Sequence, residues 1–201
     1  MGRPKALLDF DGKSCLALVL SACLEAEADE TILVLGVDEV PIREALAGLE
    51  LNGAGPSARP RVVVNAHPDR GQTSSLKIGL EAIAGSADAF MVLPIDYPLV
   101  TSKNIDALIE RFEERHHRRT IFIATHAGER GHPVLFASSH RGPILEMGDD
   151  EGLNSYIRVR EGETEEVPVE GRGILLTMNT PEQYQQLLSE YRARAASSLD
   201  A

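Results

Sequence analysis

The sequence predicts an α/β fold in which helices cover both faces of a mostly parallel sheet, giving three α/β/α layers. Short apolar runs bounded by turn residues alternate along the chain with longer segments of helical periodicity. The length of 201 residues corresponds to about one domain, and a hydrophobic content of 43% is ordinary for a globular protein. We therefore predict a single domain over residues 1–201.

Seven apolar runs with turn residues at their ends are predicted to be strands. They cover residues 31–36, 61–65, 89–95, 120–125, 132–136, 165–169 and 173–178. The segments with helical periodicity cover residues 14–27, 41–49, 74–84, 102–116, 141–147, 150–158 and 181–195. Ser14, Thr101 and Thr180 stand where helix N-caps are expected, and Pro181 follows at a first helical position, which tolerates a missing N–H.

The net charge and the cysteines limit the partners and the location. A formal charge of -11 and a pI near 5.0 argue against a nucleic-acid or anionic-membrane partner, because phosphate would be repelled. Cys15 and Cys23 are eight positions apart in one apolar segment, which favours two buried thiols over a disulfide or a metal site. No segment is long and apolar enough to span a bilayer. We expect a cytoplasmic protein.

Residues 1–8, MGRPKALL, place a lysine in a constrained turn. Pro4 fixes its own φ angle, and Gly2 allows a close approach of the backbone to a ligand. Lys5 is then held as a point charge that suits a polyphosphate. The alternative interpretation is a polar turn that precedes a helix.

Asp96 stands at the end of a buried apolar strand. Pro98 prevents the strand from continuing, so the carboxylate is presented at the strand end, where open α/β sheets bind ligands. A hard oxygen there suits Mg²⁺, which is commonly shared between one or two carboxylates and the phosphates of a nucleotide. Asp96 would otherwise cap the helix that starts near residue 102, but Thr101 is better spaced for that cap.

Residues 70–76, RGQTSSL, lead into a predicted helix. Free backbone N–H groups at a helix start, with hydroxyls and a glycine beside them, suit phosphate oxygens or the edge of a base or ribose. Serine and threonine also cap helices that bind no ligand, so both interpretations stay open.

Two further residues stand at strand ends. His132 lies between Gly131 and Pro133 at the start of an apolar strand, where a structural hydrogen bond is the common role. Asn179 follows another apolar run, and its side chain either supplies a neutral oxygen ligand or terminates the strand in an Asx turn.

Together these segments resemble the nucleotidyltransferases of molybdenum-cofactor maturation, with the molybdenum-cofactor cytidylyltransferases as the best match. The resemblance covers essentially the whole chain in order and spacing. Five segments carry the resemblance. Residues 1–8 match the end of the family motif LAAGxSxRMGxPKxLL, and residues 71–76 match G-[MQ]-[ST]-S-S-L. Residues 96–101 match D-x-P-L-V-T, residues 130–136 match RGHPVLF, and residues 179–182 match the motif D-[IT]-x-T-P-E.

The resemblance implies a Rossmann-like nucleotidyltransferase. Such an enzyme transfers CMP from CTP or, as the second choice, GMP from GTP to the terminal phosphate of a molybdopterin-type cofactor, and it releases pyrophosphate. Mg²⁺ is the implied cofactor. A molybdoenzyme or its chaperone is the implied protein partner.

The resemblance also assigns roles to residues at matching positions. Lys5 and Asp96 are implied to be catalytic, Asp96 and Asn179 to hold the metal, and His132 and Tyr97 to bind the acceptor. The implied nucleotide-binding residues are Gly2, Arg3, Lys5, Gly71, Gln72, Ser74 and Ser75.

The chain departs from the family pattern in two places. The first strand and the Gly-rich loop that follows it are missing, so we expect a domain that is N-terminally incomplete relative to the family. Asn179 replaces the aspartate that usually serves as second metal ligand, and losing one negative charge should weaken Mg²⁺ binding.

Two alternative functions follow from these departures. One is a noncatalytic relic or carrier that binds a nucleotide or a cofactor. The other is a related enzyme that guanylylates a small phosphorylated acid in deazaflavin-cofactor synthesis.

Overall fold

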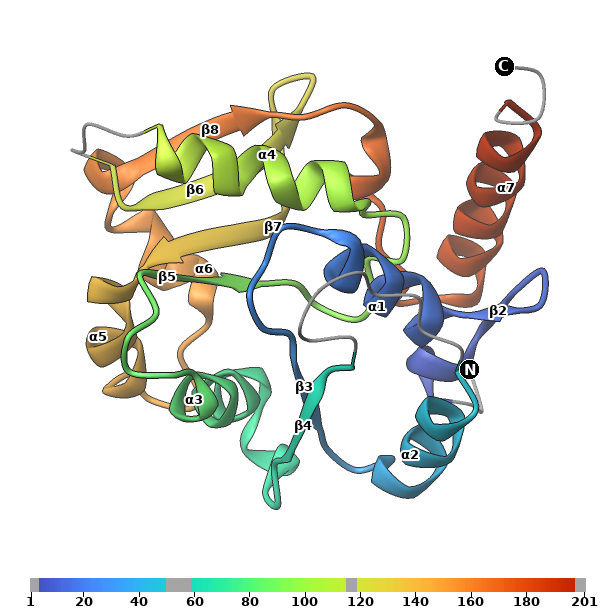
Figure 1. Cartoon of the computed structure of the whole chain (residues 1–201), viewed down its shortest axis with the longest axis horizontal. Helices are drawn as coiled ribbons and strands as arrows, with labels where there is room; N and C mark the ends of the chain where they lie inside the picture. The colour runs from blue at the N-terminus through green and yellow to red at the C-terminus, as the bar shows by residue number, and fades with distance from the viewer. Residues whose placement is uncertain (1–3, 50–58, 115–118, 198–201) are drawn as a thin grey trace.

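The largest sheet has four strands in the order β5-β7-β6-β8 (Figure 1). The computed structural model describes residues 4–49, 59–114 and 119–197. The four strands are β5 (Ala89–Val92), β6 (Ile121–His126), β7 (Glu129–Ala137) and β8 (Thr164–Pro168). β7 runs antiparallel to both β5 and β6, whereas β6 and β8 are parallel.

Two smaller sheets complete the strands of the described segments. β3 (Ile32–Leu35) pairs with β4 (Arg61–Val64) in parallel, and β1 (Asp9–Phe10) forms an antiparallel hairpin with β2 (Lys13–Ser14). Among the described residues, β3 has no strand partner besides β4, and β5 has none besides β7.

The prediction of one mostly parallel sheet therefore needs correction, because the sheets are small and mixed. The reason lies in the turn between β6 and β7. Ala127 and Gly128 both have positive φ angles, of 51° and 82°, and a two-residue turn of this kind joins strands that run antiparallel. An alanine gives no sequence signal for a positive φ, so the hairpin was not predicted.

The α-helices of the described segments lie near their predicted positions. They are α1 (Cys15–Glu25), α2 (Glu39–Ala47), α3 (Gln72–Ala82), α4 (Ser102–Glu113), α5 (Arg141–Leu145), α6 (Leu153–Arg158) and α7 (Pro181–Ser197). Short 3-10 helices are η1 (Lys5–Leu7), η2 (Pro68–Arg70), η3 (Ser138–His140), η4 (Glu161–Glu163) and η5 (Arg172–Leu175). None of the helices described is both long and apolar enough to cross a bilayer.

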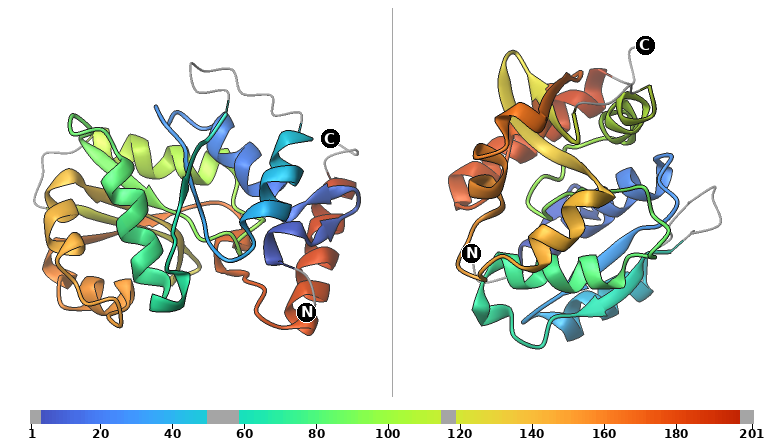
Figure 2. Two further views of the ribbon diagram at one scale, coloured as in Figure 1. Left: turned by 90° about the horizontal axis from the view of Figure 1, so that it is seen from below. Right: turned by 90° about the vertical axis from the view of Figure 1, so that its left-hand side faces the viewer.

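Helices cover both faces of the four-stranded sheet (Figures 1 and 2). Side chains alternate along β6, so Phe122 and Ala124 point to one face while Ile121 and Ile123 point to the other. The first pair packs with α1 and α4, and the second pair packs with α3, α5 and α6. This arrangement has the predicted α/β/α layers.

The predicted helix caps are confirmed. Ser14 accepts a hydrogen bond from the Ala17 N–H at the start of α1. Thr101 and Asn104 form a reciprocal capping box at the start of α4, which satisfies two backbone donors at once. Asp96 is therefore not the cap of α4.

The strand predicted at 173–178 is wrong, since η5 occupies its first part. The Leu176 N–H donates to the Gly173 carbonyl, which closes a turn instead of continuing a ladder. Gly173 also packs so closely that an added Cβ would collide with the Leu99 carbonyl oxygen. The close packing of this backbone segment therefore determines its conformation, although its apolar residues are typical of a strand.

Candidate active site

Lys5 reaches two oxygen-bearing side chains from distant parts of the chain. Its ammonium lies 2.6 Å from Asn179 Oδ1 and 3.4 Å from Asp96 Oδ2. Pro4 precedes η1 with a φ angle of -55°, and its carbonyl accepts a 2.9 Å hydrogen bond from the Leu7 N–H. The constrained turn that the sequence predicted thus presents the lysine to both oxygens.

β5 ends at Val92, three residues before the predicted strand end at 95, so Asp96 lies in the turn that follows the strand. Its carboxylate contacts a second side chain besides Lys5. The Thr177 hydroxyl donates a 2.9 Å hydrogen bond to Asp96 Oδ2, the oxygen that also faces Lys5. The Asp96 side chain is 18% exposed, so part of the carboxylate remains open to a ligand. One oxygen is therefore fixed while the group stays accessible.

Asn179 precedes α7, and its side chain is not needed for the helix cap. Gln183 Oε1 accepts hydrogen bonds from the N–H groups of Asn179 and Thr180, at 2.6 and 3.1 Å. The Gln183 N–H in turn donates to the Thr180 hydroxyl at 3.3 Å, so Thr180 caps the N-terminus of α7, as the sequence predicted. This leaves the Asn179 amide oxygen directed at Lys5 instead of at an Asx turn.

Two glycines bring three predicted motifs into close contact. A Cβ added at Gly131 would lie well inside van der Waals distance of the Ile174 carbonyl oxygen. Gly173 meets the Leu99 carbonyl in the same way, so β7, η5 and the segment after Asp96 stack backbone to backbone. Only glycine permits this approach at either position.

His132 and Tyr97 form a contact beside Asp96. Their ring centroids lie 4.6 Å apart at an angle of 57°. Burial lowers the pKa of His132, and a hydrogen bond with the Val92 backbone and, to a smaller extent, the Asp96 charge oppose this shift only in part, so the imidazole is neutral at pH 7. Burial, with a smaller effect of Asp96, raises the pKa of Tyr97. Within the described segments, buried His132 Nδ1 has no hydrogen-bond partner.

Both cysteines are free, as the sequence predicted. The Cys15 thiol donates to the Ile95 carbonyl at 3.0 Å, and burial, helped by the Asp96 charge, raises its pKa to about 12. Burial likewise raises the pKa of Cys23 to about 12. Thiols that stay protonated at neutral pH are packing groups and not nucleophiles.

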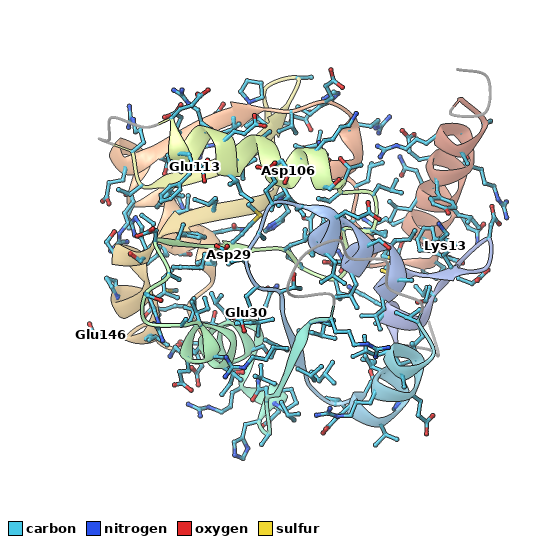
Figure 3. The ribbon with its side chains drawn as sticks, viewed as in Figure 1. Lys13, Asp29, Glu30, Asp106, Glu113 and Glu146 are labelled. Atoms are coloured by element: carbon cyan, nitrogen blue, oxygen red, sulfur yellow. The ribbon has the colours of Figure 1, made fainter. Side chains whose placement is uncertain are left out.

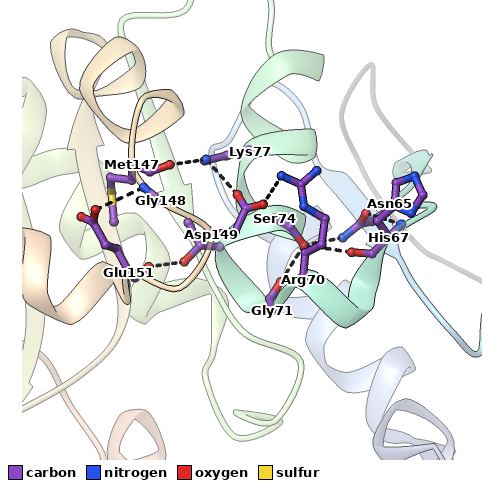
Figure 4. Close-up of polar contacts among 11 residues, drawn as sticks. Asn65, His67, Arg70, Gly71, Ser74, Lys77, Met147, Gly148, Asp149 and Glu151 are labelled. Atoms are coloured by element: carbon purple, nitrogen blue, oxygen red, sulfur yellow. Dashed lines mark hydrogen bonds and ion pairs between the residues drawn. The ribbon is translucent and has the colours of Figure 1, made fainter.

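A second group of predicted residues lies at the start of α3 (Figure 4). Gly71 has a φ angle of 102°, and its carbonyl accepts a 2.7 Å hydrogen bond from the Ser74 hydroxyl. The Asn65 amide donates to the Ser74 and Ser75 hydroxyls at 2.9 and 3.0 Å. Gln72 is the exposed first residue of the helix.

The loop before α6 packs against the same helix start (Figure 4). The Thr73 hydroxyl donates to the Glu151 carbonyl at 2.5 Å. The Asp149 carboxylate accepts from Lys77 at 2.9 Å and forms an ion pair with Arg70. The hydrogen bond from Lys77 is the main cause that lowers the pKa of Asp149, so this carboxylate stays ionised.

Comparison with known proteins assigns the family. The MobA-like NTP transferase domain matches the chain over residues 1–167. The chain belongs to this family. It is accordingly a nucleotidyltransferase enzyme. A comparison with curated proteins found no match.

Solved structures share the fold of this MobA-like domain. Rv0371c from Mycobacterium tuberculosis H37Rv is 25% identical, with a TM-score of 0.79, and the match covers 94% of this chain and 90% of that one. A complex of Rv0371C with manganese has 24% identity and a TM-score of 0.76, covering 92% and 91%. Molybdopterin-guanine dinucleotide biosynthesis protein A from Archaeoglobus fulgidus has 16% identity and a TM-score of 0.61, covering 98% and 92%.

The oxygen atoms around the Lys5 ammonium are of a kind that suits a divalent metal. Asp96 supplies a carboxylate oxygen and Asn179 an amide oxygen, and both lie close to that ammonium. No cluster of three or more His, Cys, Asp or Glu residues that could hold a metal alone occurs in the described part of the chain. Mg²⁺ in such sites is usually bound by one or two carboxylates together with substrate phosphates, so the one carboxylate of Asp96 suits this arrangement.

The predicted residues of the MobA-like domain thus form two groups. Lys5, Asp96 and Asn179 meet directly, with Tyr97 and His132 beside Asp96. The residues at the start of α3 form the other group, namely Gly71, Gln72, Ser74 and Ser75. Gly2 and Arg3 lie outside the described residues.

Sequence reasoning missed Thr177, Asn65 and Asp149. Asn65 directly follows the apolar run of β4, so the strand-end rule that selected Asp96 would also have found it. Asp149 lies between two short helices, and no local pattern marks it.

Proposed function

We propose that this chain, as one domain over residues 1–201, transfers CMP from CTP to the terminal phosphate of a molybdopterin-type cofactor. An acceptor phosphate oxygen bonds to the α-phosphorus while the bond to the β-phosphate oxygen breaks, and pyrophosphate leaves. The observation that carries the proposal is the contact of Lys5 with both Asp96 and Asn179.

The reaction depends on charge neutralisation and alignment more than on acid–base catalysis. Lys5 supplies a fixed positive charge for the triphosphate and for the charge that develops on the leaving pyrophosphate. Asp96 and Asn179 would hold Mg²⁺, which neutralises phosphate charge when it is bound. The Rv0371C complex with manganese supports a divalent metal in this role.

The nucleotide and the acceptor are assigned to separate groups of side chains. The side that would bind the nucleotide consists of Gly71, Gln72, Ser74 and Ser75 together with Gly2, Arg3 and Lys5. His132 and Tyr97 would bind the acceptor, since two adjacent rings offer aromatic surface to a planar pterin, and the buried His132 Nδ1 has no partner in the described part of the chain.

The setting and the partner follow from the proposal. Cys15 and Cys23 are free thiols, which suits a reducing cytoplasm. A molybdoenzyme or its chaperone would receive the product. The Archaeoglobus fulgidus structure, named as a molybdopterin-guanine dinucleotide biosynthesis protein, supports a molybdopterin acceptor.

Turnover assays with matched nucleotides test the function. Purified protein is incubated with Mg²⁺, molybdopterin and either CTP or GTP, and both the dinucleotide product and pyrophosphate are measured. CTP-dependent product is expected. Product from GTP alone would assign GMP transfer, and product from GTP with only a small phosphorylated acid would assign the deazaflavin-pathway reaction. Nucleotide binding without product from any acceptor would support a noncatalytic carrier.

Neutralising Asp96 is expected to remove the metal dependence of nucleotide binding. In the wild type, Mg²⁺ should strengthen CTP binding by about tenfold or more, because the metal bridges the carboxylate and the phosphates. In Asp96→Asn, calorimetry should show nearly equal CTP affinity with and without Mg²⁺. Glu113→Gln, on the surface of α4, is the matched control (Figure 3). An unchanged metal effect in Asp96→Asn would exclude Asp96 as ligand.

A further inference from the structure

Asn65 is a buried side chain at the point where β4 leads toward α3. It is 4% exposed, and its backbone N–H donates to the Leu35 carbonyl at 2.8 Å, which fixes it against β3. A side chain held in this way on a sheet provides a rigid reference for the loop that follows.

The contacts of Asn65 fix the orientation of its amide. The His67 N–H donates to Asn65 Oδ1 at 2.9 Å, so the oxygen of the amide must face His67. The NH₂ group therefore faces the opposite side, where it donates to Ser74 Oγ at 2.9 Å and to Ser75 Oγ at 3.0 Å (Figure 4 shows the Ser74 contact).

This orientation determines what the two serines can do. Each serine oxygen accepts from Asn65, so each hydroxyl must direct its own proton elsewhere. Ser74 donates to the Gly71 carbonyl at 2.7 Å. Ser75 is half-buried, and among the described residues its hydroxyl meets no acceptor. The Ser75 proton therefore remains available to a ligand.

We infer that Asn65 is a positioning residue that makes Ser75 a hydrogen-bond donor to an acceptor atom of the bound nucleotide. The inference rests on the proposed function and makes its nucleotide-binding site more specific, because it gives Ser74 and Ser75 different roles. Ser75 contacts the nucleotide, whereas Ser74 holds the turn at Gly71. The acceptor is either a phosphate oxygen or an oxygen or nitrogen of the nucleoside.

Asn65→Asp tests the inference, because it keeps the size of the side chain and replaces the donating NH₂ group with an accepting oxygen. The Ser75 proton is then drawn to residue 65 and is lost to the ligand. The dissociation constant of CTP with Mg²⁺ is expected to rise about tenfold, which corresponds to one lost hydrogen bond. Asn104→Asp is the matched control, since Asn104 is equally buried but belongs to the α4 cap.

A double-mutant cycle with Ser75→Ala separates positioning from simple charge repulsion. Ser75→Ala alone should weaken CTP binding by a similar factor, and Asn65→Asp should have no further effect in that background. If Asn65→Asp weakens binding equally in both backgrounds, its negative charge acts directly and the inference is wrong. Unchanged affinity in Ser75→Ala would also overturn it, even where Asn65→Asp does not fold.

Binding of inorganic triphosphate shows which part of the nucleotide accepts the hydrogen bond from Ser75. Nucleotide binding by the wild type shows whether the proposed function or only the role of Asn65 is wrong. Weaker triphosphate binding in Ser75→Ala places the acceptor on a phosphate, whereas weaker CTP binding alone places it on the nucleoside. If the wild type binds neither CTP nor GTP, the proposed function fails and the inference fails with it. If the wild type binds and the cycle is additive, only the inference fails.

Discussion

Replacing Lys5 with methionine is expected to lower kcat for nucleotidyl transfer by about 100-fold or more. The ammonium faces Asp96 and Asn179, where the triphosphate would bind, and methionine keeps the unbranched apolar part of the side chain without its charge. Removing one fixed donor at developing negative charge commonly lowers kcat by about 10²–10³. Steady-state kinetics with CTP, Mg²⁺ and acceptor would measure the effect.

Lys13→Met is the matched control for this substitution. Lys13 lies on the β1–β2 hairpin and is exposed, so the same loss of charge occurs on the surface (Figure 3). Its kinetics should match those of the wild type. An equal loss in both variants would indicate an effect of net charge, and an unchanged kcat in Lys5→Met would contradict the catalytic role proposed for Lys5.

Replacing Gly131 with alanine is expected to lower the free energy of unfolding by about 3 kcal/mol, which is the upper part of the range for overpacking. The added Cβ would collide with the Ile174 backbone, which has no rotamer to change. The strand must then move away from η5, and His132 would move with it. Urea denaturation followed by far-UV circular dichroism would measure the stability.

Gly85→Ala provides the comparison, since a Cβ there would meet nothing within 4 Å. We expect its free energy of unfolding to stay within about 0.5 kcal/mol of the wild type. A Gly131→Ala variant as stable as Gly85→Ala would show that the packing of β7 on η5 is loose.

Features that depend only on residues close together in the sequence were predictable. Thr101 was predicted as an N-cap from its position before a helix, and the structure confirms that it caps α4. Lys5 and Asp96 were each selected from a local pattern, a turn and a strand end, and the structure brings them to 3.4 Å. The match to the family over residues 1–167 confirms the predicted relationship.

Two kinds of feature were not predictable in this way. One is a local turn with an unusual residue: the positive φ at Ala127 reverses the chain into a hairpin, although alanine seldom adopts this conformation. The other depends on contacts between distant segments. The apolar residues before Thr177 resembled a strand, but close packing at Gly173 turned the backbone into η5. Asp149 reaches α3 only through the fold.

The contact between Lys5 and Asn179 joins residues 174 positions apart. The same two parts of the chain meet again where Tyr184 donates to the Asp9 carbonyl and where Arg192 pairs with Asp11, 181 positions away. Contacts of such high sequence separation form late, because loop closure must precede them. During synthesis, a ribosome-bound chain cannot bring Lys5 to Asn179 until residue 179 has left the ribosome, so this contact forms only after nearly all of the described elements have been made.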